Sequence, residues 1–200
     1  MANDGVNKSR RRLLTYATAG VGAVGAVFTA VPFIKSWSPS ARTRAAGAPV
    51  DVAIGKLEPG QMLRVKWRGK AVYVLRRSEE QLETLRKLTK SGELKDPNSE
   101  DREQQPEYAR NEFRSIKPDL IVMYGICTHL GCAPSYMPEA GSLSPDWVGG
   151  YFCPCHGSKF DFAGRVFKGV PAGKNLGIPP HRYVTDTLIR VGEDHEGGKA

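Results

Sequence analysis

Two short stretches of this sequence concentrate the side chains that bind soft metals. Residues 127–132 read CTHLGC, and residues 153–158 read CPCHGS. Between them they supply six candidate ligands: Cys127, His129, Cys132, Cys153, Cys155 and His156. A tetrahedral zinc ion or a two-iron cluster takes only four ligands from the protein. The pair of stretches therefore predicts a metal centre with two ligand-type side chains to spare.

Other catalytic chemistry has no comparable signal in the chain. The sequence contains neither a Gly-x-x-x-x-Gly-Lys-Ser/Thr phosphate loop nor a Gly-x-Ser-x-Gly nucleophile motif. A structural zinc site stays open on residue types alone, although zinc ribbons use Cys-x-x-Cys pairs and need no more than four ligands. All four cysteines lie in the two stretches, so the chain reserves its sulfur for one site.

The two stretches resemble the signature boxes of Rieske iron–sulfur proteins. The form with four cysteines is similar to the Rieske subunit of the cytochrome bc complex, ubiquinol–cytochrome c reductase. This resemblance implies one 2Fe-2S cluster per chain, with two thiolates on one iron and two imidazoles on the other. The implied ligands are Cys127, Cys153, His129 and His156. The spare cysteines, Cys132 and Cys155, are implied to form a disulfide, which a periplasmic location permits.

The same resemblance implies a subunit of a proton-translocating quinol–cytochrome c reductase. The globular head would take an electron from quinol at the cytochrome b subunit and pass it to a c-type cytochrome. His156 would accept a hydrogen bond and then the proton from quinol. Two neutral imidazoles make the cluster less negative than four thiolates would, which raises its reduction potential. The implied partners are these subunits, quinol and the membrane, in a dimeric complex without nucleic acid.

Two residues after the second box are implied to tune the cluster. Ser158 matches a serine whose hydroxyl donates to a cluster sulfide. Phe160 stands where high-potential members of the family place a tyrosine, whose hydroxyl reaches a ligand sulfur. Since phenylalanine cannot make that hydrogen bond, we expect a potential below the top of the family range.

The surroundings of the cluster are implied by the same resemblance. Leu130, Gly131 and Gly157 match the exposed tip that docks on cytochrome b. A loop that shields the cluster often reads Pro-Ala-Pro in the family, and this chain has Pro171, Ala172 and Gly173 there. Because glycine loosens a backbone, we expect a less rigid shield.

Three alternative functions share parts of this pattern. The small Rieske subunit of a periplasmic molybdenum oxidoreductase such as arsenite oxidase also has an export signal and Rieske boxes. Ring-hydroxylating dioxygenases are disfavoured, because their cytoplasmic Rieske domains lack the extra cysteine pair. A zinc-binding module without redox chemistry is the third alternative. The charged stretch 91–119 and an anchor without a clear cleavage site favour the bc complex.

The elements that must position the boxes begin with a basic and apolar N-terminus. Residues 1–48 hold seven basic residues and one acid, so most of the net charge of +8 lies outside the globular part. A DNA-binding domain would carry that charge on its folded surface. Residues 9–14, SRRRLL, resemble a twin-arginine export signal. The uncharged run from Leu13 to Ile34 would span about 33 Å as a helix, enough to cross a bilayer.

The N-terminal pattern predicts how the chain is organised. We expect a cytoplasmic basic segment over residues 1–12, a transmembrane anchor over 13–35, a flexible hinge over 36–53 and a periplasmic Rieske domain over 54–200. Alanines at 41, 45 and 46 could serve a cleavage site. The length of the apolar run and the nearby arginines at 42 and 44 favour retention instead. The location is then the bacterial inner membrane, with a single pass.

Short apolar runs with turn signals predict an all-β, antiparallel, Rieske-type β-sandwich with a short inserted helix. We expect a hairpin from the strands 62–67 and 71–77, strands 120–125 and 150–152 leading into the boxes, a hairpin over 161–167, a loop over 169–180 and a closing strand over 183–191. Ser78 and Gln81 form a capping box ahead of Leu82, Leu85 and Leu88, which share one helix face. Residues 91–119 are expected to be a surface excursion. His181 and His195 lie outside the boxes and are expected in loops or on the surface.

Overall fold

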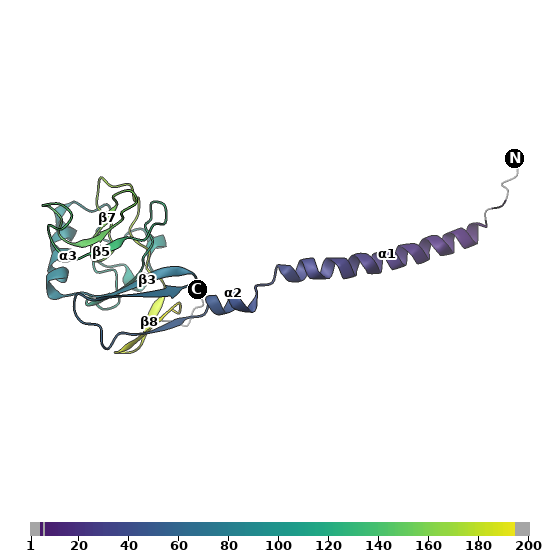
Figure 1. Cartoon of the computed structure of the whole chain (residues 1–200), viewed down its shortest axis with the longest axis horizontal. Helices are drawn as coiled ribbons and strands as arrows, with labels where there is room; N and C mark the ends of the chain where they lie inside the picture. Colours follow the sequence, from purple (N-terminus) through teal and green to yellow (C-terminus); the bar gives the residue numbers. More distant parts are fainter. Residues whose placement is uncertain (1–4, 6, 195–200) are drawn as a thin grey trace. The chain divides into compact units, whose positions relative to one another are not determined.

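The computed structural model describes residues 5 and 7–194 of the 200-residue chain. It divides into two compact units, Met1–Ala45 and Ala46–Ala200. Figure 1 traces the helical first unit and the β-rich second unit. Residues 1–4, 6 and 195–200, which include His195 and the ends of two predicted segments, lie outside the described residues.

The first unit is built on a long apolar helix, α1 (Lys8–Ser36). The Asn7 side chain caps it by accepting a hydrogen bond from the Arg10 N–H. The helix has no buried residue and tolerates Pro32 in its interior. Among the described residues it is the one helix long and apolar enough to cross a membrane. It contains the whole predicted anchor, whose insertion stays a prediction. A short helix, α2 (Ala41–Ala46), follows.

The second unit is made of antiparallel sheets, as predicted. Its described residues form three sheets of three strands, in the orders β1-β9-β8, β2-β3-β4 and β5-β6-β7. The strands are β1 (Val50–Ala53), β2 (Met62–Trp67), β3 (Lys70–Arg76), β4 (Leu120–Tyr124), β5 (Ser135–Met137), β6 (Gly150–Phe152), β7 (Lys159–Phe160), β8 (His181–Thr185) and β9 (Leu188–Val191). The predicted β2–β3 hairpin, β4 and β6 are all present, whereas β5 was not anticipated.

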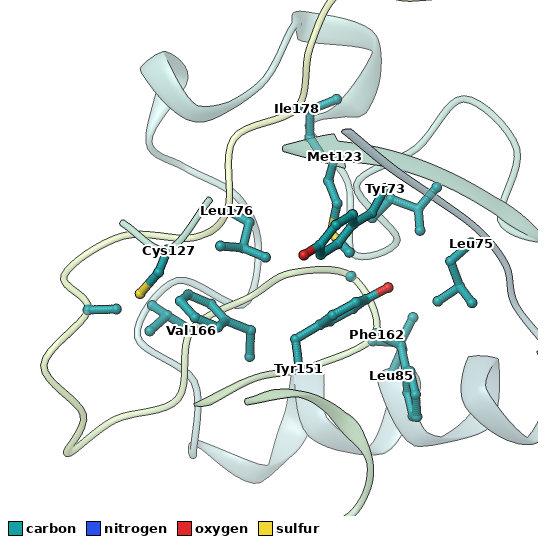
Figure 2. Packing of buried hydrophobic residues seen from close by; sticks show 14 of the residues in the cluster. Tyr73, Leu75, Leu85, Met123, Cys127, Tyr151, Phe162, Val166, Leu176 and Ile178 are labelled. Carbon is teal, nitrogen blue, oxygen red and sulfur yellow. The ribbon is translucent and has the colours of Figure 1, made fainter. Parts of the chain in front are cut away.

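Strand β3 is buried on both faces, which makes its sheet the middle layer of the unit. Val72 and Val74 pack into a cluster with residues of β1 and β9. Tyr73 and Leu75 alternate with them and point into a second cluster with α3 and the loops after β4 and β6. Figure 2 shows this second cluster, with Cys127 at one end. The first cysteine of each box, Cys127 and Cys153, is therefore part of the hydrophobic core.

The inserted helix is α3 (Glu79–Ser91), and its predicted cap is confirmed. The Ser78 hydroxyl accepts from the Gln81 N–H, while the Gln81 side chain accepts from the Ser78 N–H. The three leucines of the predicted stripe are buried, and Gly92 ends the helix in the left-handed region. This helix closes the core beneath the boxes.

Two predictions for the ends of this unit were wrong. Residues 183–191 are two strands rather than one, because a turn at Asp186–Thr187 folds β9 back against β8. Thr185 stabilises the turn by accepting a hydrogen bond from the Thr187 N–H. The last residues of the predicted hinge, Val50–Ala53, are β1 and pair with β9. Because α2 lies inside the predicted hinge, a flexible connection stays a prediction only for residues 37–40 and 47–49, on either side of that helix.

The stretch 91–119 is not a surface excursion. Arg114 is fully buried and donates hydrogen bonds to the Ala163 carbonyl and the Gln105 side chain. Leu94 pairs with Phe167 across an isolated bridge. The stretch also forms the short 3-10 helices η1 (Arg102–Gln104) and η2 (Glu107–Ala109). Its charge was misleading because guanidinium groups satisfy several buried carbonyls at once.

The predicted hairpin over 161–167 turns at Ala163–Gly164, as expected, with Gly164 at φ 69°. Its paired arms are shifted, since Phe160 bridges Val166 and the preceding strand is β7. Asp161 lies in the turn, where it makes a fully buried ion pair of 2.6 Å with Arg165. A separate correction concerns His181, which is 2% exposed rather than on the surface.

Candidate metal centre

The first box follows β4 and closes on itself through two backbone hydrogen bonds. The Cys127 N–H donates to the Cys132 carbonyl at 2.7 Å, and the Gly131 N–H donates back to the Cys127 carbonyl at 2.9 Å. Gly131 has a φ of 83°, a conformation that favours glycine. The loop thereby presents Cys127 inward and Leu130, which is 71% exposed, outward.

The second box follows β6 and repeats the same frame. The Cys153 N–H donates to the Ser158 carbonyl at 2.8 Å, and the Gly157 N–H donates to the Cys153 carbonyl at 2.9 Å. Gly157 has a φ of 77°, like Gly131 in the first box. The backbone hydrogen bonds of the two boxes match, but the histidines occupy different positions: His129 is the third residue of its box and His156 is the fourth.

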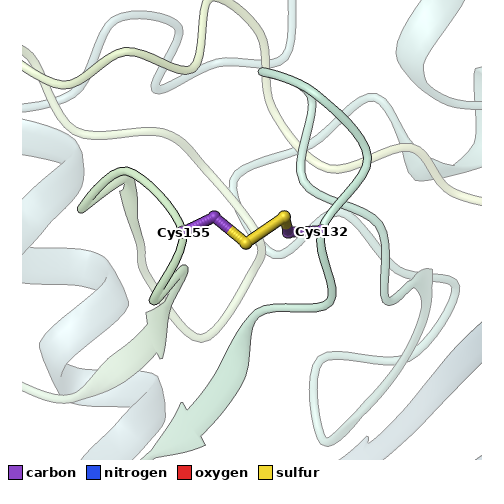
Figure 3. Close-up of a disulfide and its surroundings, with 2 residues drawn as sticks. All are labelled: Cys132 and Cys155. Carbon is purple, nitrogen blue, oxygen red and sulfur yellow. A yellow bond between two sulfur atoms is a disulfide. The ribbon is translucent and has the colours of Figure 1, made fainter.

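A disulfide joins the two boxes. Cys132 and Cys155 are bonded through their sulfurs, with Cα atoms 6.6 Å apart (Figure 3). The bond ties the last residue of the first box to the middle of the second box. Two loops that leave different strands are therefore held together covalently beside the remaining cysteines.

The remaining cysteines, Cys127 and Cys153, are free thiols and almost fully buried, at 3% and 1% exposure. Burial raises the pKa of the Cys153 thiol, and hydrogen bonding with the Cys127 side chain raises it further. The neutral thiol is therefore the expected state of Cys153 in this apolar setting. A bound cation reverses this preference, because a coordinating thiol loses its proton.

The two histidines of the boxes face each other. The ring centroids of His129 and His156 lie 4.7 Å apart, edge to face. The His129 Nδ1 atom is buried and has no hydrogen-bond partner in the described part of the chain. A buried imidazole nitrogen without a partner is costly unless a ligand occupies that side. His156, in contrast, is exposed to solvent.

These side chains fit a 2Fe-2S cluster with mixed ligands. Each box contributes one free thiol and one imidazole: the Cys127 and Cys153 side chains hydrogen-bond each other, and the His129 and His156 rings contact each other. The Sγ atoms of Cys132, Cys153 and Cys155 also lie within 4.8 Å of one another, but two of these sulfurs are consumed by the disulfide. Of the six candidate side chains in the two boxes, the disulfide uses two, and the remaining two cysteines and two histidines are the four ligands that a Rieske-type cluster requires.

The residues predicted to tune and shield the centre adjoin it. Ser158 is fully buried, and its Oγ accepts a 3.0 Å hydrogen bond from the Ala172 N–H. Its own hydroxyl hydrogen is thus left to donate elsewhere. Phe160 is fully buried in the same cluster as the two free cysteines. Pro171 and Gly173 are exposed on either side of buried Ala172.

Three residues at the centre were missed by sequence reasoning. Tyr73 of β3 donates a 2.9 Å hydrogen bond to the Pro134 carbonyl just after the first box. Its ring stacks on Tyr151, two residues before the second box, with centroids 5.9 Å apart (Figure 2). Thr128 donates to the Lys174 carbonyl at 2.6 Å and so joins the first box to the loop over residues 169–180, the shield loop. No local pattern marks these long-range contacts.

Comparison with known proteins covers both units. Residues 1–40 match the family described as ubiquitinol-cytochrome C reductase Fe-S subunit TAT signal, and residues 49–180 match the Rieske [2Fe-2S] domain. The ubiquinol-cytochrome c reductase iron-sulfur subunit of Allochromatium vinosum is 59% identical, over 97% of this chain and 93% of the relative. The same subunit of Blastochloris viridis is 42% identical, over 96% of this chain and 97% of that relative.

Among solved structures, a chain of a hyperthermophilic respiratory Complex III aligns with a TM-score of 0.47 and 22% identity. The alignment covers 88% of this chain and 98% of that chain. The sequence relatives match along nearly their whole length, so the comparison includes the N-terminal helix, both boxes and the shield loop.

Proposed function

This chain belongs to the Rieske family of ubiquinol–cytochrome c reductase iron–sulfur subunits, and on that basis we propose that it carries electrons from quinol to a c-type cytochrome. The family places it in an oxidoreductase complex of the cytochrome bc type, with a Rieske-type 2Fe-2S cluster as cofactor. The molybdenum oxidoreductase alternative is not favoured, because the relatives from Allochromatium vinosum and Blastochloris viridis are subunits of the bc type.

The observation that carries this proposal is that two loops with matching backbone hydrogen bonds bring their two thiols into contact with each other and their two imidazoles into contact with each other. Cys127 and Cys153 would hold one iron, and His129 and His156 the other. When bound, the cluster supplies reversible transfer of one electron at a time. The buried cysteines exclude water from the sulfur side, and the disulfide keeps the two boxes from separating.

Of the two histidines, His156 is the one we propose to meet quinol. It is exposed, whereas the His129 ring is half-buried with Nδ1 fully enclosed. An imidazole nitrogen that faces outward can accept a hydrogen bond from a quinol hydroxyl and then take its proton. Leu130, highly exposed in the first box, would offer an apolar contact to cytochrome b.

We further propose that α1 is retained as an anchor in the bacterial inner membrane, with the second unit in the periplasm and the complex dimeric. The arginines at 10–12 precede the apolar run, as expected for a cytoplasmic end. Residues 37–40 and 47–49, on either side of α2, would act as the hinge that lets the head alternate between its two cytochrome partners. The intact mass of the membrane-extracted chain tests retention, because cleavage at residues 41–46 would remove the helix.

The proposed function is tested by electron paramagnetic resonance of reduced membranes, recorded with and without an inhibitor of the quinol site. We expect a Rieske signal whose line shape changes when the inhibitor is present, since an inhibitor bound at the quinol site would contact His156. A signal indifferent to the inhibitor would contradict docking at the quinol site. Molybdenum in place of haem in the purified complex would support the alternative enzyme, and zinc in place of iron would exclude electron transfer.

A further inference from the structure

The shield loop is held on its inner side by both boxes. The Ala172 N–H donates to the Ser158 hydroxyl, and the Thr128 hydroxyl donates to the Lys174 carbonyl. Beyond Gly173, Lys174 pairs with Asp101 and Asn175 donates to the Asp96 carbonyl, so that part of the loop has its own anchors. The outer side of the loop at Pro171 and Gly173, which are exposed, has a separate support.

That outer support is Lys95, which comes from the stretch expected to be a surface excursion. Its Nζ donates to the Ala172 carbonyl at 2.6 Å and to the Val170 carbonyl at 3.1 Å. The two carbonyls flank the Ala172 N–H that binds Ser158. The Lys95 ammonium group therefore binds the backbone on both sides of the Ala172 amide, which itself bonds Ser158 of the second box.

Lys95 is itself well placed to act as a clamp. Its N–H donates to the Val166 carbonyl at 3.0 Å, and the Lys168 N–H donates to the Glu93 carbonyl at 2.8 Å. These bonds pair residues 93–95 with residues 166–168, directly ahead of the shield loop. The backbone that carries the ammonium is thus fixed, so holding the side chain costs only its own rotamer freedom.

The backbone of the shield loop has little intrinsic stiffness at Gly173. A side chain built at Gly173 would meet no heavy atom within 4 Å, and the backbone there is not left-handed. Glycine is therefore not required for the loop to reach its shape, and it leaves the backbone free to move. Hydrogen bonds from a charged donor are stronger than those between neutral groups, so Lys95 adds rigidity to the loop around Ala172.

We propose that Lys95 is a positioning residue for the shield loop, which it holds so that the Ala172 amide stays on the Ser158 hydroxyl. The role of the loop as a cover for the cluster rests on the proposed function. The clamp itself is a statement about backbone order, and it can be measured whether or not the electron-transfer function is correct.

The test compares hydrogen–deuterium exchange in the full-length purified protein and three variants. Lys95→Met removes the ammonium and keeps most of the side-chain length, Lys95→Arg keeps a charged donor, and Lys168→Met is a matched control on an exposed neighbouring lysine. We expect Lys95→Met to speed exchange in residues 169–176 about tenfold, as for a local opening. The other two variants should stay within about twofold of the parent protein.

The rate at which visible absorption is lost at elevated temperature gives a second readout, and it should rise only in Lys95→Met. Unchanged exchange in residues 169–176 of Lys95→Met would overturn the inference. So would a uniform rise that includes β2 and β3, because that pattern indicates general destabilisation. If the parent protein lacks a Rieske signal, the proposed function fails, whereas the exchange result still decides the role of Lys95.

Discussion

The ring of Tyr73 occupies the space that a side chain at Gly125 would need. A Cβ atom built at Gly125 would lie 2.3 Å from Cε1 and Cζ of that ring. Gly125 precedes Cys127 by two residues, and the Tyr73 hydroxyl bonds Pro134 on the other side of the first box. A single side chain of the central sheet therefore contacts both ends of the loop that supplies Cys127 and His129.

Gly125→Ala is expected to destabilise the protein by about 1–3 kcal/mol, because the new methyl group forces the ring or the loop to move. Gly173→Ala is the matched control, since its Cβ meets open space, and it should change stability by less than about 0.5 kcal/mol. Urea unfolding midpoints measure both variants. Equal midpoints would show that the Tyr73 contact does not constrain the box.

Phe160→Tyr is expected to raise the midpoint potential of the cluster. We expect the added hydroxyl to reach a sulfur of the proposed ligands, because Phe160 is fully buried in the same core cluster as Cys127 and Cys153. One new hydrogen bond of about 0.5–1.5 kcal/mol corresponds to roughly 20–60 mV for one electron. Redox titration followed by electron paramagnetic resonance measures the shift. A lower or unchanged midpoint would remove this explanation of the potential.

Loss of the disulfide should loosen the centre without unfolding the whole domain. The Cys132–Cys155 bond closes a sequence separation of 23 residues, for which chain entropy predicts roughly 3 kcal/mol of stabilisation. We expect the double variant Cys132→Ala/Cys155→Ala to release iron faster on warming while its far-ultraviolet circular dichroism stays near that of the parent. Iron retention equal to that of the parent would mean that the clasp is dispensable.

His181 should make the domain sensitive to mild acid. Burial lowers its pKa to about 4, against the opposing hydrogen bond to Pro179. Below pH 6.5 the imidazole of His181 is protonated in the unfolded chain but stays neutral in the folded chain. The free energy of unfolding therefore falls as the pH drops toward 4, by about 3 kcal/mol in all. His181→Asn retains a donor for the 2.8 Å contact with the Pro179 carbonyl but does not titrate.

The measurement is the free energy of unfolding of the parent and of His181→Asn between pH 7 and pH 4. The difference between the two proteins should grow in favour of the variant as the pH falls. Parallel pH profiles would contradict a buried neutral imidazole at this position.

Shortening the proposed hinge should slow turnover but leave the cluster intact. Deleting residues 47–49 removes chain just ahead of β1 without touching either box. We expect reduced quinol–cytochrome c reductase activity in the assembled complex, with an unchanged spectrum of the reduced cluster. Normal activity in the shortened chain would argue against movement of the head.

Local chemistry made much of this molecule predictable, and long-range contacts did not. The boxes, the capping box of α3 and the β2–β3 hairpin each depend on residues close together in sequence, so their patterns are legible. The Lys95 and Tyr73 contacts join residues 77 and 61 positions apart, to Ala172 and Pro134 respectively. Nothing near a lysine in a charged stretch reveals which carbonyls it will meet.

Polar residues misled for a related reason. Arg114 and His181 were expected outside the core because burial of a polar side chain is costly unless it is hydrogen-bonded. Arg114 donates to the Ala163 carbonyl, 49 positions away, and the backbone N–H of His181 donates to the Tyr108 hydroxyl, 73 positions away. Those partners come together only in the folded domain. The two-strand ending, in turn, depends on a turn at Asp186–Thr187 that contains no glycine or proline.

The most direct test of the metal centre is iron content with electron paramagnetic resonance of the reduced, purified protein and three histidine variants. We predict a signal typical of mixed cysteine and histidine ligation in the parent, retention of iron and signal in His181→Asn, and loss of both in His129→Ala and His156→Ala. If either box variant kept its iron and an unaltered signal, nitrogen ligation by these two residues, and with it a Rieske-type centre in this protein, would be contradicted.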